Sequence, residues 1–278
     1  MTESRENRGR ETTSGDREII VGWRQRIGNL THLYKYKDIS GTGRRHLSEM
    51  FQDRALYFPT YADLNDPFDS NFTLHFDATD EEKRAHWDEV LPTDHPDRSS
   101  EIARRLALSN DKAEMERRQL ETRAMLSKYG VCCLTEKPDN ILMWSYYAGG
   151  HAGVCLRFRT VDLFHSYGKA PGVLVPVEYA KSYPRLGFFE PGIARIFSAS
   201  VGTKSSAWEH EAEWRIVRPD MRGSLPCDPF ALDGVVLGCN ISKKDEVFVR
   251  NLAASASVPV VRAPKRAHDY GIDVAWPP

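Results

Sequence analysis

The sequence predicts an α+β fold, in which a mixed, strongly bent or split β-sheet has flanking helices and a helical insertion. Three observations lead to this class. Short alternating or continuous apolar runs recur along much of the chain, one long charged stretch has a helical pattern, and the C-terminal part has the pattern strand, helix, strand. We expect a single domain over residues 18–278, with the helical insertion at residues 79–129.

Composition indicates a protein with a sizeable core. The chain has 278 residues, of which 41% are hydrophobic and 28% are charged, and its net charge is −1. Such a balance provides no global field toward nucleic acid or acidic lipid. Residues 1–17 are polar and contain no apolar run of signal or membrane length, so we expect a disordered tail, a cytoplasmic protein and no membrane partner. The odd number of cysteines, five, without zinc-type spacing predicts reduced, mostly buried thiols.

The first part of the chain predicts a strand, a helix, a second strand and a turn. Residues 31–36 alternate between apolar and polar side chains, which is typical of a strand. A short helix fits residues 46–54, and a second strand fits residues 55–58 before Pro59 ends it. Residues 61–69 then have the Asn, Asp and Pro content of a turn.

The remaining elements follow from capping and periodicity. Thr79 and Glu82 form a capping box, and the helical pattern continues to Lys128 with an interruption around residues 92–100. The further strands are expected at residues 131–135, 153–158, 173–179, 208–217, 233–238 and 258–261, and the further helices at residues 141–147 and after Ser242. The last strand, helix and strand form a candidate right-handed crossover.

The stretch from Lys204 to Val217 has the highest density of acidic, basic and aromatic residues. A period of two places Glu209, Glu211, Glu213 and Arg215 on one face. A helix is the competing interpretation, but the alternation and the β-branched end favour a strand. Neighbouring carboxylates raise at least one pKa while Arg215 lowers it, which suits a site for a polar or cationic centre. An exposed Glu/Arg ladder at a sheet edge is the alternative.

Two other groups are candidates for chemistry. Asn65, Asp66 and Asp69 are an ordinary Asx-Pro turn, or they coordinate a hard cation together with Glu211 or Glu213. The second possibility would indicate a metal-dependent nuclease.

His151 and the aromatic helix that precedes it form the other group. His151 follows two glycines, and it is a candidate acid, base or phosphate donor or a structural residue. Trp144, Tyr146 and Tyr147 are candidates to stack on a base or a nicotinamide ring, or they belong to the core. No phosphate-binding loop or dinucleotide fingerprint is present.

An ordered set of motifs resembles a known family. The motifs are Leu33-Tyr-Lys-Tyr36, Ala55-Leu-Tyr-Phe58, Leu64-Asn-Asp-Pro-Phe-Asp69, Met143-Trp144 with His151-Ala-Gly-Val154, and Trp208-x-x-Glu211-x-Glu213-x-Arg215. Together they resemble the bacterial domain-of-unknown-function family 2971, over a span from about residue 31 to residue 262. This family implies a coherent fold but little chemistry.

Glu211-Ala-Glu213 also looks like the paired-glutamate motif of the ADP-ribosyltransferases. That resemblance implies NAD as the substrate, without a required metal. Glu213 would stabilise the oxocarbenium-like centre, Glu211 would orient or deprotonate the acceptor, and Lys35 would replace the usual Arg or His of an early strand. Residues 57–60 would be the hydroxyl-bearing strand, where Phe58 and Pro59 depart from the pattern. The substrate-binding residues would be Tyr36, Tyr57, Asn65, Asp66, Trp144, His151, Trp208 and Arg215.

The sequence therefore predicts an ADP-ribosyltransferase-like enzyme that modifies a macromolecular acceptor, either protein or nucleic acid. Its setting would be a toxin or effector of bacterial conflict or phage defence, with a cognate inhibitor or a defence-system partner. A metal-dependent nuclease is one alternative, and a non-catalytic sensor or binding module is another. An enzyme requires the acidic segment, Lys35 and the Asn65 turn to meet in one concave pocket, whereas a binding module requires a broad basic or aromatic surface.

Overall fold

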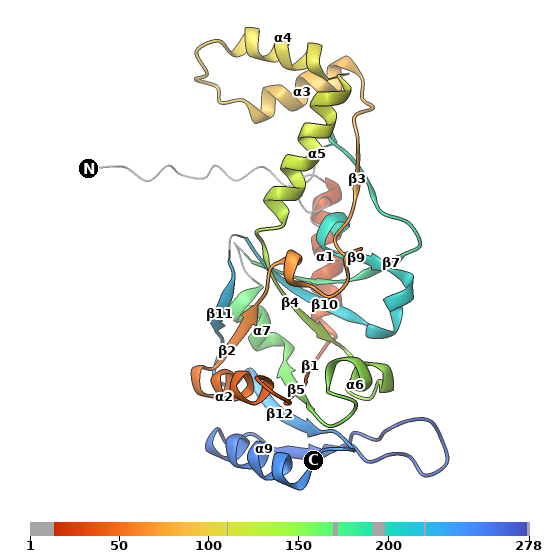
Figure 1. Ribbon diagram of the computed structural model, residues 1–278. Coiled ribbons are helices and arrows are strands. Elements are labelled where there is room, and N and C mark those ends of the chain that lie inside the picture. Colours follow the sequence, from red (N-terminus) through yellow and green to blue (C-terminus); the bar gives the residue numbers. More distant parts are fainter. Residues whose placement is uncertain (1–13, 110, 169–171, 191–197, 220, 277–278) are drawn as a thin grey trace, which may run out of the picture.

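A seven-stranded sheet forms the centre of the molecule (Figure 1). The structure is a computed structural model, and it describes residues 14–109, 111–168, 172–190, 198–219 and 221–276. The strand order is β13 (Val260–Arg262), β12 (Leu232–Leu237), β5 (Val154–Arg159), β1 (His32–Lys37), β4 (Gly130–Thr135), β10 (Glu213–Arg218) and β6 (Val173–Pro176). Neighbouring strands are antiparallel, except that β12 and β13 are parallel.

Among the described residues, three small sheets and two 3-10 helices surround this centre. The antiparallel pair is β2 (Ala55–Phe58) with β11 (Gly223–Pro226), and the parallel pairs are β3 (Thr73–His75) with β8 (Arg185–Gly187) and β7 (Glu178–Ala180) with β9 (Thr203–Ser205). The 3-10 helices are η1 (Tyr61–Asp63) and η2 (Ser206–Glu211). The fold is therefore α+β with a sheet divided into several parts, as the sequence predicts.

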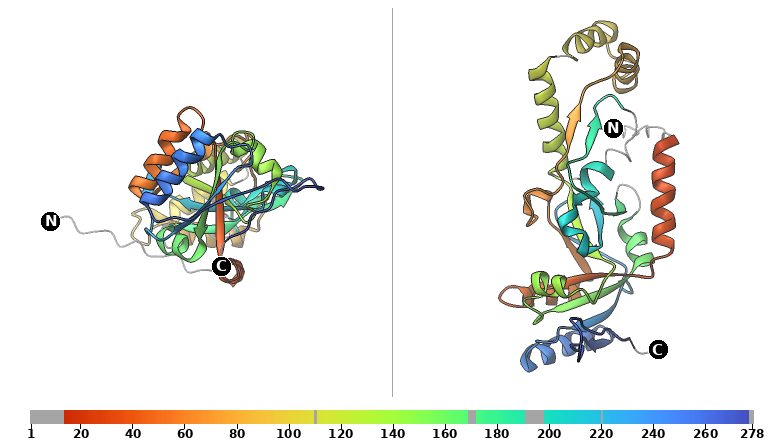
Figure 2. Two further views of the ribbon diagram at one scale, coloured as in Figure 1. Left: turned by 90° about the horizontal axis from the view of Figure 1, so that it is seen from below. Right: turned by 90° about the vertical axis from the view of Figure 1, so that its right-hand side faces the viewer.

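The α-helices lie at the ends and on the sides of the sheet. They are α1 (Ser14–Gly28), α2 (Gly43–Asp53), α3 (Asp80–Val90), α4 (Arg98–Leu108), α5 (Lys112–Leu126), α6 (Ile141–Tyr147), α7 (Thr160–Tyr167) and α9 (Lys243–Ser255). Helices α3, α4 and α5 stand together at one end of the molecule, and α9 lies at the opposite end (Figure 1). The second view of Figure 2 shows α1 running along one side. No helix of the described residues is long and apolar enough to cross a membrane.

The sheet splits between β1 and β4. The two strands share the single pair Tyr34 and Thr135, whereas β1 pairs with β5 along its whole length. The start of β4 turns instead to the segment after β2, where the Val131 N–H donates to the Pro59 carbonyl over 2.7 Å. An opening therefore remains between β1 and β4, and it positions the site described below.

Both faces of the sheet are covered. On one face, Leu33 and Trp214 belong to a buried core that includes residues of α2, α7 and α9. On the other face, Tyr34 and Tyr36 pack with Trp144 of α6. Because successive residues of a strand point to opposite faces, the short motif at residues 33–36 contributes to both cores.

Most predicted elements are present. The segments expected at residues 31–36, 46–54, 55–58, 131–135 and 141–147 are β1, α2, β2, β4 and α6. The Thr79 and Glu82 side chains form the predicted capping box at the start of α3, and the Ser242 hydroxyl caps α9. The five cysteines are free thiols.

One predicted strand is wrong in its first half. Residues 206–211 form the 3-10 helix η2, and the strand β10 begins only at Glu213. Ala212 lies between them with a left-handed φ of 43°. The turn brings Glu211 back to Lys204, seven residues earlier, which an extended chain would not do.

The described residues begin within the predicted tail. Residues 1–13 lie outside the described residues, but α1 begins at Ser14, within the stretch expected to be disordered. Ile27 and Leu30 pack against the main core, and the Arg26 guanidinium lies 5.3 Å from the Trp214 ring centroid. These contacts lie at the C-terminal end of α1 and just after it, so the first turn of the helix extends from a part of the chain that packs on the core.

Docking of α1 predicts that Ile27→Ala lowers the free energy of unfolding by about 1–2 kcal/mol, because a half-buried side chain loses part of its apolar contact. Urea denaturation measures this change. Arg24→Ala is the matched control, since Arg24 is exposed on the same helix. Equal effects of the two substitutions would contradict the docking of α1.

Candidate active site

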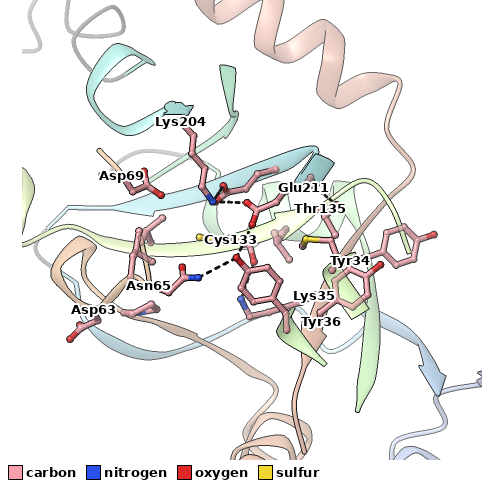
Figure 3. A pocket seen from close by; sticks show the side chains of 17 residues that line it. Tyr34, Lys35, Tyr36, Asp63, Asn65, Asp69, Cys133, Thr135, Lys204 and Glu211 are labelled. Carbon is pink, nitrogen blue, oxygen red and sulfur yellow. Dashed lines mark hydrogen bonds and ion pairs between the residues drawn. The ribbon is translucent and has the colours of Figure 1, made fainter. Parts of the chain in front are cut away.

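A concave cavity of about 310 Å³ lies at the opening between β1 and β4 (Figure 3). Its walls come from β1, β4, β10, α6, η2 and the turn at residues 63–69. The lining is mixed, because tyrosine rings and apolar side chains alternate with charged groups. Segments that are far apart in the sequence therefore meet at one site.

Arg215 is the centre of a buried ion network beside this cavity. Its side chain is 0% exposed, and it binds the Asp69 carboxylate through two hydrogen bonds of 2.6 and 2.8 Å. Its Nε also donates to Glu213 Oε1 over 2.8 Å. Bidentate guanidinium–carboxylate pairs are among the strongest charge-assisted contacts. Arg215 thus connects the turn after β2 to the central strand β10.

Lys204 extends the network to the second glutamate. Its Nζ donates to Glu211 Oε2 over 2.5 Å and to Glu213 Oε2 over 3.1 Å. All three side chains are buried. The two glutamates are therefore held at one ammonium group, although only Glu213 lies on the strand.

The two glutamates have different protonation properties. Burial alone would raise the pKa of Glu213, but Arg215 and Lys204 hold that pKa at about 2. Burial raises the pKa of the Glu211 carboxyl above its usual value, although Lys204 opposes this. Within these direct ion pairs, three carboxylates (including Asp69) meet two cations. Glu211 is consequently the carboxyl group best suited to exchange a proton.

Two polar side chains on the cavity wall orient Glu211. The Tyr147 hydroxyl donates to Glu211 Oε1 over 2.7 Å, and the Asn65 side-chain amide donates to the Tyr147 hydroxyl over 3.3 Å (Figure 3). Burial, followed by the contact with Glu211, raises the pKa of Tyr147. Tyr147 therefore stays protonated and fixes one oxygen of the carboxylate.

Lys35 reaches the cavity from β1. Its Nζ donates to the Cys133 carbonyl over 2.9 Å, at the position where β4 has left β1. The lysine thereby satisfies a strand carbonyl next to the opening, and its ammonium group also lines the cavity. Lys35 makes no ion pair within 4.0 Å among the described residues. Lys204 and Arg215, in contrast, each contact two carboxylates.

The structure brings together seven of the residues that the sequence singles out. The cavity is lined by Lys35, Tyr36, Asn65, Asp69, Tyr147, Glu211 and Glu213. Arg215 lies fully buried beside them and does not line it. The interpretation of the acidic stretch as an exposed ladder at a sheet edge is wrong, because β10 lies between β4 and β6.

Five other candidates lie outside this cavity. Tyr57 is 51% exposed and faces a second cavity, and the Asp66 carboxylate accepts from the Phe68 N–H within its own turn. Trp144 is a fully buried core residue. His151 contacts Ser145 and stacks on Trp144, with ring centroids 6.2 Å apart. Trp208 packs against the Lys204 ammonium group, 5.0 Å from its ring centroid.

The sequence analysis singles out Lys204, Asp69 and Tyr147 but does not predict that Lys204 and Asp69 belong to an ion network or that Tyr147 binds Glu211. A weak signal for the role of Lys204 existed, because the acidic stretch contains more carboxylates than its one arginine can balance. No local signal pairs Asp69 with Arg215, since the two residues are 146 positions apart.

The turn at residues 65–69 is not arranged as a metal centre. Asp69 is engaged with Arg215, and Asp66 caps its own turn. In the part of the chain that the structure describes, no group of three or more His, Cys, Asp or Glu side chains is placed to hold a metal ion. The polar turn instead supplies Asn65 and Asp69 to the cavity and its ion network.

Comparison with protein families gives one match. Residues 143–216 match the model of the family described as protein of unknown function (DUF2971). The match confirms the family resemblance over about a quarter of the chain, and it contains Tyr147, Lys204, Glu211, Glu213 and Arg215. No curated protein and no solved structure matches the chain.

The matched segment depends on residues beyond its bounds. Lys35, Asn65 and Asp69 all precede residue 143, yet they line the cavity or bind its charged groups. The matched segment therefore carries most of the ion network but only part of the cavity.

The buried position of Arg215 predicts that Arg215→Met costs about 3–5 kcal/mol of unfolding free energy, because Asp69 and Glu213 would lose their shared cation. Arg222→Met is the control, since the pair of Arg222 and Asp63 is exposed, and we expect a change within about 0.5 kcal/mol. Chemical denaturation followed by circular dichroism measures both values. A similar small change for both variants would contradict the central position of Arg215.

The low pKa of Glu213 also predicts acid sensitivity. Because this pKa falls from its ordinary value of 4.5 to about 2 on folding, the unfolded chain binds the proton more readily. The stability that Glu213 contributes is complete above about pH 4.5 and is lost as the pH falls toward about 2. Denaturation at several pH values should show a smaller loss across this window in Glu213→Gln than in the unaltered protein. Glu209→Gln should keep the full loss, and an unchanged pH dependence in Glu213→Gln would refute the prediction.

Proposed function

We propose that the cavity is the active site of an enzyme that cleaves NAD and transfers ADP-ribose to a macromolecular acceptor. The observation that carries this proposal is the convergence of Lys35, Asn65 and Glu211 on one cavity. These residues come from β1, from the turn after β2 and from η2. A binding module with glutamates that only support a surface would not need this convergence.

The walls of the cavity suit a cationic ring. The ion network has one carboxylate more than it has cations, and its Glu211 end faces a cavity lined by the rings of Tyr34, Tyr36 and Tyr147. Aromatic faces and negative charge both attract a positively charged ring. The nicotinamide ring of NAD carries a positive charge until its bond to the ribose breaks. The nicotinamide ring is small enough to fit in a cavity of about 310 Å³, which is within the size range of small-molecule sites.

The proposed reaction begins with cleavage of the bond between the ribose C1′ and the nicotinamide nitrogen. The bonding electron pair moves to the ring, which leaves as neutral nicotinamide, and positive charge develops on the ribose. A nucleophilic oxygen or nitrogen of the acceptor then forms the new bond to C1′. The Glu211 carboxylate accepts the proton that the acceptor loses, and a pKa above the ordinary value makes it a better base at neutral pH.

The contacts of the two glutamates support other roles for Glu211 and Glu213 than those that the resemblance implies. Both oxygens of Glu213 bind cations, because Oε1 accepts from Arg215 and Oε2 accepts from Lys204 and Arg215. Its charge is thus already compensated. We assign Glu213 as the positioning residue that holds Lys204, and Glu211 as the catalytic residue at the cavity wall.

Nicotinamide release from labelled NAD tests the proposal. The unaltered protein, incubated with NAD and a cell lysate, should release nicotinamide and transfer label to an acceptor, and a chelator should not prevent either event. Glu211→Gln should lower the rate of transfer by on the order of a hundredfold or more, because the acceptor loses its base. Glu209→Gln is the matched control, since Glu209 is an exposed residue of the same 3-10 helix and does not line the cavity. Absence of nicotinamide release in every condition would end the NAD proposal, and chelator-sensitive loss of nucleic acid would support a nuclease.

A further inference from the structure

A second cavity of about 500 Å³ adjoins the candidate active site. It lies between β1, α2, β2 and β11, and Lys35 and Pro59 line both cavities. Lys37, His46 and Ser224 are among its other polar lining residues. Nothing in the proposed acid–base chemistry uses this second cavity.

The face of β1 that points toward the second cavity changes from apolar to charged along the strand. Leu33, Lys35 and Lys37 occupy alternate positions, so their side chains leave the strand on the same face. Leu33 is fully buried in the main core with residues of α2 and β2. The next two positions on this core-facing side are lysines, and the cavity opens beside them.

The two lysines are half-buried, and neither forms an ion pair within the described residues. Lys35 donates to the Cys133 carbonyl. Burial together with the charge of Lys35 lowers the pKa of Lys37. Two like charges in this setting repel one another, and the repulsion is relieved when an anion binds between them.

The same cavity also has two acidic lining residues. Glu49 and Asp53 are exposed residues of α2. Glu49 also has its own cation, because the Arg45 Nε lies 3.7 Å from its carboxylate. The charges that β1 itself contributes to the cavity are therefore both positive, whereas the negative charges come from exposed residues of α2.

We infer that the second cavity binds the pyrophosphate of the dinucleotide whose nicotinamide end occupies the first cavity. This inference rests on the proposed function. Lys35 is the link, because it lines both cavities and separates the carboxylate end of the site from Lys37. A ligand that is cationic at one end and anionic further along matches this order of charges. Ammonium groups are common phosphate ligands, and each charge-assisted contact strengthens binding.

Calorimetric titration with inorganic pyrophosphate tests the anion site without any need for turnover. The unaltered full-length protein should bind pyrophosphate, and ADP-ribose should compete with it. Lys37→Met should weaken binding by on the order of tenfold, and Lys37→Arg should retain it. Lys244→Met is the matched control, because Lys244 is exposed on α9 and lines neither cavity. Thermal melting of each variant shows whether the fold is intact.

The outcomes separate this inference from the proposed function. Absence of pyrophosphate binding, or equal binding by the unaltered protein and a folded Lys37→Met variant, overturns the anion site. Binding that depends on Lys37 without nicotinamide release from NAD supports the anion site and removes the proposed function. Nicotinamide release with an unchanged KM for NAD in Lys37→Met overturns the assignment of the pyrophosphate to this cavity. A raised KM with a nearly unchanged kcat supports both.

Discussion

The buried guanidinium of Arg215 is the interaction on which the candidate site depends. It joins Asp69, in the turn after β2, to Glu213 on the central strand β10. Lys204 then joins Glu213 to Glu211, so a single chain of ion pairs runs from the turn to the cavity wall. The cost of removing these charges from water is offset only while every partner is in place. The network is therefore a means of fixing geometry more than a source of stability.

The split in the central sheet makes room for this geometry. A continuous sheet would place β1 and β4 side by side and fill the space between them with main-chain hydrogen bonds. Their separation after one residue pair leaves the Cys133 carbonyl to Lys35. One lysine thus replaces part of a strand ladder, and it lies at the boundary of two cavities. The candidate chemistry of the protein is concentrated where its regular structure is interrupted.

Local patterns predicted what depends on local geometry. Alternation placed Glu213 and Arg215 on the same face of a strand, and both are there. The same alternation failed for Glu211, because the 3-10 turn that carries it is stabilised by contact with Lys204 from an earlier segment. The pairing of Asp69 with Arg215 spans 146 positions and has no local signature. Short paired strands such as β3 and β8 were likewise missed, since three residues are too few to show a period.

The conformation of Ala212 requires that one residue separates Glu211 from Glu213. On a regular strand, residues 211 and 213 would lie on the same face, separated by two rises along the chain. In the structure, the left-handed backbone at Ala212 joins the 3-10 helix that carries Glu211 to the strand that carries Glu213, and both carboxylates contact the Lys204 ammonium group. A one-residue insertion or deletion here would rotate one carboxylate away from that ammonium group. The backbone conformation at Ala212 therefore fixes the spacing of the two glutamates. In an alignment of relatives, a gap at this position would indicate that the two glutamates no longer share the lysine contact, even where both acidic residues remain.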